Sequence, residues 1–229
     1  MNLRTKIALS VLIFTTAWVL AIPVRSQTPA RAPFAEDQGK FEISVDGKQV
    51  GTEEFSVAHD GAGWVARGTT EFRLASGTGR VTGELHVNAA GAPLRYEWNL
   101  DAGKKVTSKT TFDGNEAKMS TDMGQKTPLE QDFMFASPVV ILDNNLYDQY
   151  GVLARLYNWS TRGPQNFAVL IPQEHQPGNI TVESTGPASG NNQQLRVHTN
   201  DLDVFLTLDS SHRLMRISVP SSKAEIVRK

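Results

Sequence analysis

The fold is decided by a stretch of strict alternation, residues 94–100, which has the sequence LRYEWNL. Tyr96, Trp98 and the two flanking leucines are separated by single polar residues, which is the period of a strand with one buried and one solvated face. Strands of this kind are typical of antiparallel sheets, because parallel sheets are covered on both faces. The same alternation recurs along most of the chain, so the sequence predicts a mainly β protein built on a large antiparallel sheet.

Turn residues between the alternating stretches predict how the strands connect. Asp46-Gly47 and Asp113-Gly114 are hairpin dipeptides, because both residue types tolerate a positive φ. Such short gaps favour a meander of sequence neighbours, since a crossover between parallel strands needs about a dozen residues or more. The alternation predicts about twelve strands in all.

The alternation continues near the C-terminus with one irregularity. In the stretch 202–208, Phe205 falls out of phase with the apolar residues around it. In the next stretch, Met215, Ile217 and Val219 alternate with polar residues, which predicts that these three side chains face the core.

One segment, residues 143–157, has a helical pattern. Asp143-Asn144-Asn145 offers side chains that can cap the amides of a first helical turn. An apolar stripe with helical spacing follows and consists of Leu146, Tyr150, Leu153 and Tyr157. One helix cannot cover the buried faces of about twelve strands, so we expect the sheet to cover itself, as a sandwich or as an open or half-closed barrel around the helix.

The N-terminus, residues 1–26, has the three parts of a secretory signal peptide. Arg4 and Lys6 precede an apolar run at residues 7–22, and Ser26 provides a small residue at the cleavage site. The alternative is a retained membrane anchor, although the run is short for a hydrocarbon core about 30 Å thick. The pattern therefore predicts cleavage and a periplasmic or secreted location.

Cleavage would leave a mature chain that suits one domain. Residues 27–38 are polar and rich in alanine and proline, which predicts a flexible leader. Residues 39–229 are long enough for a single β-rich domain with a full core. No later stretch is long and apolar enough to span a bilayer, so we expect no transmembrane segment after cleavage.

Charge and cysteine content restrict the partners. The mature chain has 20 basic and 24 acidic side chains and no basic run. Nucleic acid is therefore not an expected partner, and neither is an anionic membrane surface. The chain has no cysteine, so it forms no disulfide in an oxidising compartment and depends on its core for stability.

The chain lacks the usual motifs of catalysis and metal binding. None of its five histidines follows another at metal-ligand spacing, and His86 and His198 lie on the polar phase of their strands, which predicts solvated side chains. Asp201 and Asp203 share a strand face, where they could bind calcium or face solvent. There is no nucleophile elbow, phosphate-binding loop or dinucleotide fingerprint. We therefore predict no catalytic residue, metal or cofactor, and an enzyme is the least supported class.

Aromatic and apolar residues around the predicted helix give the one candidate binding site. Aromatic groups with a polar tip often line ligand cavities, although they also fill cores. A barrel of more than about eight strands has room inside for a ligand. The predicted ligand-binding residues are Tyr96, Trp98, Phe133, Phe135, Leu146, Tyr150, Leu153 and Tyr157.

Three short stretches carry a family resemblance. Residues 41–51, FEISVDGKQVG, resemble the opening hairpin of uncharacterised exported bacterial β-rich families, which are domains of unknown function. Residues 143–147, DNNLY, and residues 214–220, LMRISVP, are similar to their middle and end. The likeness covers the mature chain and implies a fold without a chemistry. In architecture, a meander wrapped on one helix also resembles the half-barrel of the bacterial lipoprotein-carrier proteins, the LolA/LolB class.

Three functions remain open from the sequence. The first is a cell-envelope protein that binds a hydrophobic or lipid-like small molecule between the curved sheet and the helix. The second is a structural or protein-interaction module of the envelope, with a filled core and an exposed strand edge as its contact surface. The third, a hydrolase, has no visible nucleophile and base.

Overall fold

The computed structural model describes residues 34–74, 77–137, 139–161, 163–188 and 190–229. Its first eight strands are β1 (Asp37–Val45), β2 (Lys48–Asp60), β3 (Gly63–Leu74), β4 (Gly77–Val87), β5 (Pro93–Asp101), β6 (Lys105–Asp113), β7 (Glu116–Asp122) and β8 (Leu129–Met134). The rest comprises β9 (Val139–Ile141), α1 (Asp148–Leu156), β10 (Gln165–Ile171), β11 (Gln176–Pro187), β12 (Gln193–His198), β13 (Asp203–Leu208), β14 (Leu214–Val219) and β15 (Ala224–Arg228). Short 3₁₀ turns, Pro172–Glu174 and Pro220–Ser222, precede β11 and β15.

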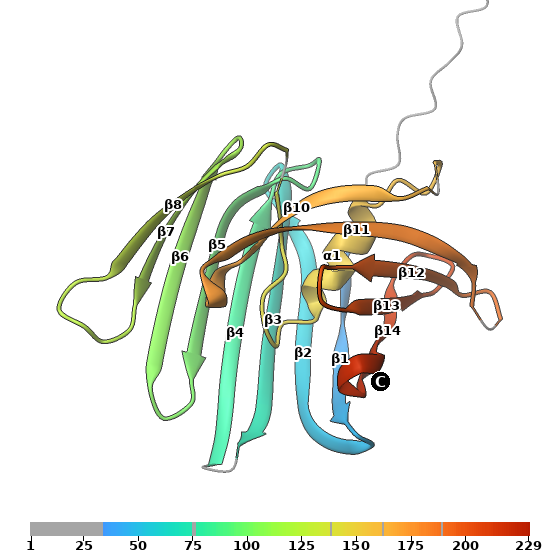
Figure 1. Cartoon of the computed structure of the whole chain (residues 1–229), viewed down its shortest axis with the longest axis horizontal. Helices are drawn as coiled ribbons and strands as arrows, with labels where there is room; N and C mark the ends of the chain where they lie inside the picture. The colour runs from blue at the N-terminus through green and yellow to red at the C-terminus, as the bar shows by residue number, and fades with distance from the viewer. Residues whose placement is uncertain (1–33, 75–76, 138, 162, 189) are drawn as a thin grey trace, which may run out of the picture. The chain divides into compact units, whose positions relative to one another are not determined.

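All fifteen strands of the described residues belong to one sheet that does not close. Its order is β8-β7-β6-β5-β4-β3-β2-β1-β15-β14-β13-β12-β11-β10-β9. Every pairing is antiparallel except that of β9 with β10. The predicted meander around one α-helix is confirmed, because strands that are neighbours in sequence pair within each of two arms, β1 to β8 and β9 to β15 (Figure 1). No helix in the described part of the chain is long and apolar enough to cross a membrane.

The two arms of the meander meet where the first and last strands pair. β1 and β15 are antiparallel, with Phe41 opposite Arg228 and Ile43 opposite Ile226. The turn after β1 has the predicted form, since Asp46 and Gly47 have φ values of 51° and 75°. Pairing of the chain's first and last strands is a contact of very high sequence separation, which local patterning does not reveal.

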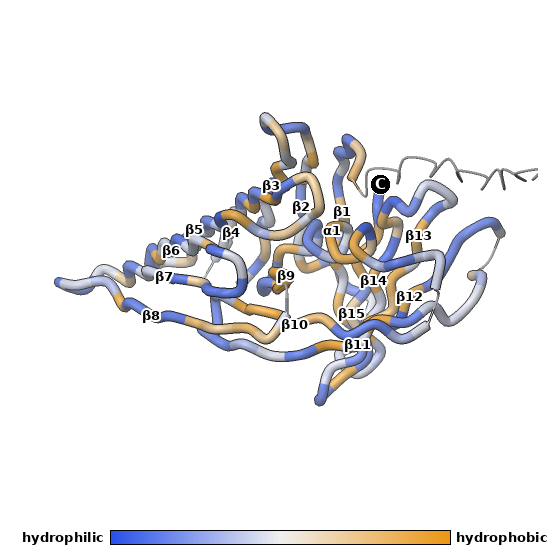
Figure 2. The backbone as a smooth tube through the Cα atoms, turned by 90° about the horizontal axis from the view of Figure 1, so that it is seen from above, coloured by the Kyte–Doolittle hydropathy of each residue, from blue (hydrophilic) through white to orange (hydrophobic). Residues whose placement is uncertain are grey.

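The apolar side chains form two clusters, and α1 contributes to both. One contains Leu153 and Ala154 of α1 with side chains of β1 and β10 to β15. The other contains Leu146 and Val152 with side chains of β2 to β5 and β9. α1 contacts β3 and β14, and so it connects the two arms. Figure 2 shows the alternation of hydrophilic and hydrophobic residues along the strands from which these clusters are built.

The helix is shorter than the predicted range 143–157. Asp143 and Asn145 do not cap it, because the Asp143 carboxylate accepts other hydrogen bonds and Asn145 has a positive φ of 60°. Tyr147 stands at the N-cap position and makes no capping hydrogen bond with its side chain. The segment before Asp148 is therefore an irregular connection, in which Asp143 and Leu146 are buried and Asn144 and Asn145 are exposed.

The predicted signal peptide, residues 1–26, lies outside the described residues, as does the first part of the predicted leader. The described end of that leader is packed, which differs from the expected flexible segment. Phe34 is buried against Trp64, with ring centroids 6.0 Å apart, and β1 begins already at Asp37.

Candidate functional site

The eight predicted ligand-binding residues are divided between the two apolar clusters. Leu153 and Tyr157 lie in the cluster of β10 to β15, and Tyr150 packs against it. The cluster of β2 to β5 contains Tyr96, Trp98, Phe135 and Leu146, with Phe133 packed against it. Six of the eight side chains are buried, and only Phe133 and Tyr150 are half-buried. Because the set does not line one described hollow, its role in ligand binding stays a prediction.

Tyr96 takes part in a buried polar network beside the helix. Its hydroxyl donates to Asp143 Oδ2 at 2.9 Å and accepts from Gln149 Nε2 at 3.1 Å. Gln149 Oε1 in turn accepts from the backbone amide of Asp143. Burial raises the pKa of Asp143 to about 6, against the opposing effect of hydrogen bonds from the Gln173 amide, the Tyr96 hydroxyl and the Asn144 amide. The network joins β5 to the segment after β9, so the Tyr96 hydroxyl has a structural partner.

A second buried group lies at the start of α1. Glu53 of β2 accepts hydrogen bonds from the amides of Tyr147 and Asp148, at 3.0 and 3.3 Å. Asp148 is itself buried, and its Oδ1 has no hydrogen-bond donor among the described residues. Burial raises the pKa of Glu53 well above its ordinary value, and nearby Asp148 adds to the rise.

A hollow of ligand size lies on the outward face of strands β12 to β15. We call it the outer trough. Its volume is about 600 Å³, within the range of about 300–1,000 Å³ that is typical of ligand sites. It crosses four strands, and it is lined by Ala188, Asn192, Gln194, Phe205, Thr207, Met215, Arg216, Ser218, Val227 and Arg228.

Strand register explains how the outer trough is assembled. Gln194 of β12 pairs with Thr207 of β13, Thr207 pairs with Arg216 of β14, and Arg216 pairs with Val227 of β15. Residues directly opposite one another point to the same face of a sheet. These four side chains therefore form one row, on the face opposite to the buried leucines and isoleucines of the same strands.

Two irregularities place apolar side chains on this outward face. Phe205 lies on the polar phase of β13, where it is half-buried. A β-bulge leaves Met215 without a partner, because Thr207 pairs with Arg216 and Leu208 with Leu214. Bulges redirect side chains and are frequent beside functional sites. The prediction that Met215 faces the core is wrong for this reason, whereas the phase of Phe205 was a signal visible in the sequence.

Both arginines that line the outer trough form ion pairs with carboxylates. Arg216 Nε donates to Glu225 Oε2 at 2.6 Å, and the Arg216 hydrogen bond lowers the pKa of Glu225. Arg228 pairs with Asp37, with 2.7 Å between Nη2 and Oδ1. The trough thus combines four apolar side chains, uncharged hydrogen-bonding groups and two paired arginines.

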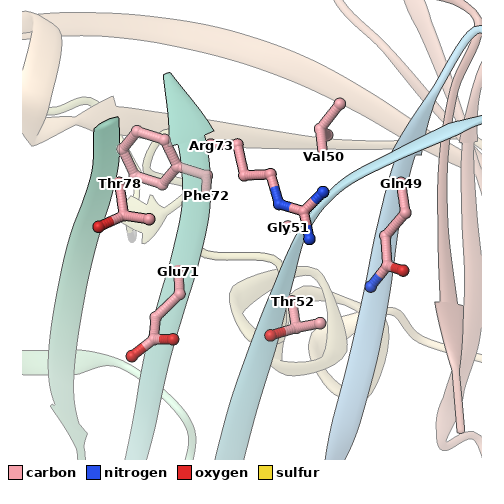
Figure 3. Close-up of a pocket in the computed structure, with 8 residues that line it drawn as sticks. All are labelled: Gln49, Val50, Gly51, Thr52, Glu71, Phe72, Arg73 and Thr78. Carbon is pink, nitrogen blue, oxygen red and sulfur yellow. The ribbon is translucent and has the colours of Figure 1, made fainter. Parts of the chain in front are cut away.

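Another hollow, between β2 and β3 and the start of β4, is smaller. Its volume is about 170 Å³, and Glu71, Phe72 and Arg73 project beside Gln49 and Thr52 (Figure 3). This is below the usual range for ligand sites. None of the eight predicted residues lines it.

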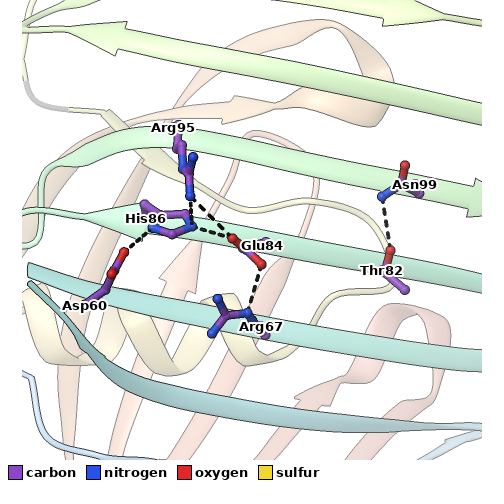
Figure 4. A network of polar contacts seen from close by, with 7 residues as sticks. All are labelled: Asp60, Arg67, Thr82, Glu84, His86, Arg95 and Asn99. Atoms are coloured by element: carbon purple, nitrogen blue, oxygen red, sulfur yellow. Dashed lines mark hydrogen bonds and ion pairs between the residues drawn. The ribbon is translucent and has the colours of Figure 1, made fainter.

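A polar network on the outward face of β2 to β5 surrounds His86 (Figure 4). The ring Nδ1 lies 2.7 Å from Asp60, Nε2 lies 2.5 Å from Glu84, and Arg95 is 2.8 Å from Nε2. Arg67 also donates to Glu84, and the hydrogen bond from His86 lowers the pKa of that carboxylate. The prediction of a solvated His86 is wrong, because these partners leave its side chain 9% exposed. The network joins neighbouring strands and presents no nucleophile.

No group of three or more histidine, cysteine, aspartate or glutamate residues in the described ranges could hold a metal ion.

The edge strand β8 is the other exposed feature. Three of the six exposed large hydrophobic residues of the described chain lie on it or in the connection from β7: Met123, Leu129 and Met134, at 43%, 40% and 76% exposure. β8 pairs with β7 on one side alone, and Glu130 and Asp132 are also exposed along it.

Comparison with known proteins gives one structural similarity. No family model matches the chain, and a search of curated proteins finds no match. A DUF1089 family protein from Pseudomonas aeruginosa is similar in structure, with 10% sequence identity and a TM-score of 0.49. The match covers 74% of this chain and 90% of that one. At this level, function must rest on the chain's own residues, and the likeness to lipoprotein-carrier proteins stays a prediction.

Proposed function

We propose that this chain is an exported binding protein that takes up a hydrophobic, lipid-like molecule in the outer trough. The observation that carries the proposal is the pair of irregularities that place Phe205 and Met215 on the outward face of a sheet. Apolar groups in a hollow of this volume are typical of small-molecule sites. The proposal keeps the ligand class expected from the sequence and moves the site from the interior to the outward face.

The lining of the trough favours an amphipathic ligand without net charge. Phe205, Met215 and Val227 would contact its apolar part, whereas Gln194 and Thr207 can hydrogen bond to a polar end. Both arginines already have carboxylate partners, so an anionic end would have to compete with them. Location in the cell envelope follows from the predicted signal peptide and is part of the proposal.

Binding can be measured with the uncharged fluorescent probe N-phenyl-1-naphthylamine on solvent-extracted protein. We expect saturable uptake, and Phe205→Thr with Met215→Thr should weaken it about tenfold or more, since burial of such a side chain contributes about 1.5–3 kcal/mol. Threonine keeps the strand propensity. Leu94→Thr, at an apolar side chain of β5 that is 50% exposed, is the matched control.

Native mass spectrometry of protein purified without detergent gives an independent readout. A stoichiometric adduct that is lost in the double variant and kept in Leu94→Thr supports the outer trough as the site. Uptake that is unchanged in the double variant, or absent from the wild-type protein, contradicts the proposal.

A second candidate, strand addition by a protein partner, is favoured by β8. An edge strand offers unpaired backbone groups, and exposed apolar side chains along it mark an interaction surface. A partner segment would add next to β8 and place its own side chains in alternation.

Hydrogen exchange separates the two candidates. A bound strand should slow exchange at alternate amides of β8, because it hydrogen bonds every second residue of the edge. Uptake of a small molecule in the outer trough should leave β8 unchanged and protect β13 and β14. The protein is incubated with envelope extract before the measurement. If exchange along β8 is not slowed, no partner in the extract has added a strand there.

A further inference from the structure

The start of α1 is held by two carboxyl groups, Glu53 and Asp148, which we call the carboxyl pair. Both are buried, at 0% and 5% exposure. No lysine, arginine or histidine of the described chain forms an ion pair with either of them. Buried carboxylates without a cation are rare, because an unpaired charge is expensive away from water.

The geometry brings the two carboxyl groups to one point above β3. A Cβ atom added at Gly68 would lie 2.7 Å from Asp148 Oδ1 and 2.7 Å from Glu53 Oε1. Glu53 accepts the amides of Tyr147 and Asp148, whereas Asp148 Oδ1 has no donor among the described residues. Two acceptors this close are satisfied together if one proton lies between them.

We propose that a proton shared by Glu53 and Asp148 holds the N-terminal end of α1 on strands β2 and β3, and that loss of this proton as the pH rises releases that end. The protonated pair is one neutral donor and one carboxylate, which the helix-start amides stabilise. The fully ionised pair is two negative charges in a site without a cation. The carboxyl pair is thereby a pH-sensitive attachment of the helix.

The groups around the carboxyl pair make ionisation more expensive. The neighbours are acidic or neutral: Tyr147 at the N-cap of α1, Tyr150 within α1, Thr70 of β3, Tyr96 of β5 and Asp143 after β9. Burial raises the pKa of Asp148 to about 6, and burial followed by repulsion from Asp148 raises that of Glu53 well above its ordinary value.

Release at this end of α1 would first affect Leu146. This side chain is 1% exposed, and its methyl groups lie against the backbone at Gly68 and Gly83. Since α1 contributes to both apolar clusters, loosening its first turn would loosen the contact between the two arms of the sheet while Leu153 and Ala154 remain in the cluster of β10 to β15.

Hydrogen exchange of the full chain at pH 5 and pH 8 tests the proposal, with rates corrected for intrinsic exchange. We expect protection of the Tyr147 and Asp148 amides to fall about tenfold per pH unit once the shared proton is lost, whereas the amide of Tyr157 at the other end of the helix stays protected. Glu53→Gln should remove this pH dependence, because an amide donates to Asp148 without titrating.

Glu54→Gln is the matched control, since Glu54 follows on the same strand and its side chain is 72% exposed. It should leave the wild-type profile unchanged. Carboxyl ¹³C titration of the wild-type protein gives a readout that needs no variant, and two coupled steps with at least one far above the ordinary range are expected. The proposal is overturned if Glu53 and Asp148 titrate independently at ordinary values, or if the wild-type exchange profile equals that of Glu53→Gln.

Discussion

The two edge strands of the sheet, β8 and β9, are adjacent in sequence but differ in burial and in how they pair. β9 is completely buried, with Val139, Val140 and Ile141 at 2%, 6% and 2% exposure. It pairs in parallel with β10 and contacts β5 of the opposite arm. β8 has no second neighbour in the described sheet, and Met134 near its end is 76% exposed. One edge is covered by the fold, and the other is open.

The difference follows from the sequence of each strand and from whether other strands pack against its faces. The three apolar residues of β9 suit a strand covered on both faces, as parallel strands usually are. β8 has the sequence LEQDFM, in which the exposed acids Glu130 and Asp132 limit aggregation of an open edge. The comparison teaches that a sheet of this size can protect one edge by packing and the other by charge.

The largest expected effect concerns the covered edge. Ile141→Ala should lower the free energy of unfolding by about 2–5 kcal/mol, because it removes buried methyl groups and leaves a cavity that the surrounding side chains fill only in part. Leu129→Ala on the open edge should change it by about 0.5 kcal/mol or less. Urea denaturation of both variants measures the difference, and equal losses would show that β8 is covered as well.

The attachment of the covered edge should depend on pH through Asp143, which follows β9 and accepts from Tyr96. Its pKa is raised to about 6, above the ordinary value of 3.8. The protonated Asp143 therefore contributes up to roughly 3 kcal/mol to the free energy of unfolding. This contribution is complete below about pH 4 and is lost as the pH rises through about 6.

Asp143→Asn isolates this contribution from those of the other carboxylates, of which Glu84 and Glu225 have a lowered pKa and Glu53 has a raised one. The stability difference between wild type and variant, measured by urea denaturation from pH 4 to pH 7, should shift in favour of the variant as the pH rises. A constant difference would mean that Asp143 titrates normally.

Two glycines beneath and within α1, Gly68 and Gly151, differ in how much room a Cβ atom would have. Gly68→Ala should destabilise by about 1–3 kcal/mol, because a Cβ atom would meet the carboxyl pair at 2.7 Å and Leu146 at 3.0 Å. Gly151→Ala within α1 should stabilise by about 0.5–1 kcal/mol, since its nearest neighbour, Leu214, would be 3.7 Å away. Thermal unfolding checks both signs, and a neutral Gly68→Ala would contradict the crowding at β3.

The smallest effect is expected at the open edge. Met134→Lys should change the unfolding free energy by less than about 0.5 kcal/mol, because the side chain is exposed. It should reduce any concentration-dependent association, since edge lysines discourage strand pairing. Sedimentation velocity compares the two proteins, and stronger association of the variant would contradict an open apolar edge.

Local patterning was sufficient for the fold class and for the meander. Alternation around Tyr96 and Trp98 and the turn at Asp46-Gly47 depend on neighbours in the chain, so they could be predicted. The short helix was predicted at residues 143–157 and found at Asp148–Leu156, because Asp143 binds residues distant in sequence and does not cap it. About twelve strands were expected and fifteen are present in the described residues.

The candidate site could be predicted only in part. Phe205 was out of phase, which was a local signal for an apolar group on the outward face. Met215 could not be placed, since a bulge is a property of two paired strands and the alternation alone put it in the core. Glu53 was also missed, because its partners follow almost a hundred residues later in the chain.

The sequence by itself determined that this protein is a largely antiparallel sheet with one helix, since side-chain periodicity and turn chemistry act between neighbouring residues. The tertiary structure alone decided that β1 pairs with β15, that β9 is covered while β8 is open, and that Glu53 meets Asp148. These outcomes depend on which distant segments share a face, and no local pattern records that choice.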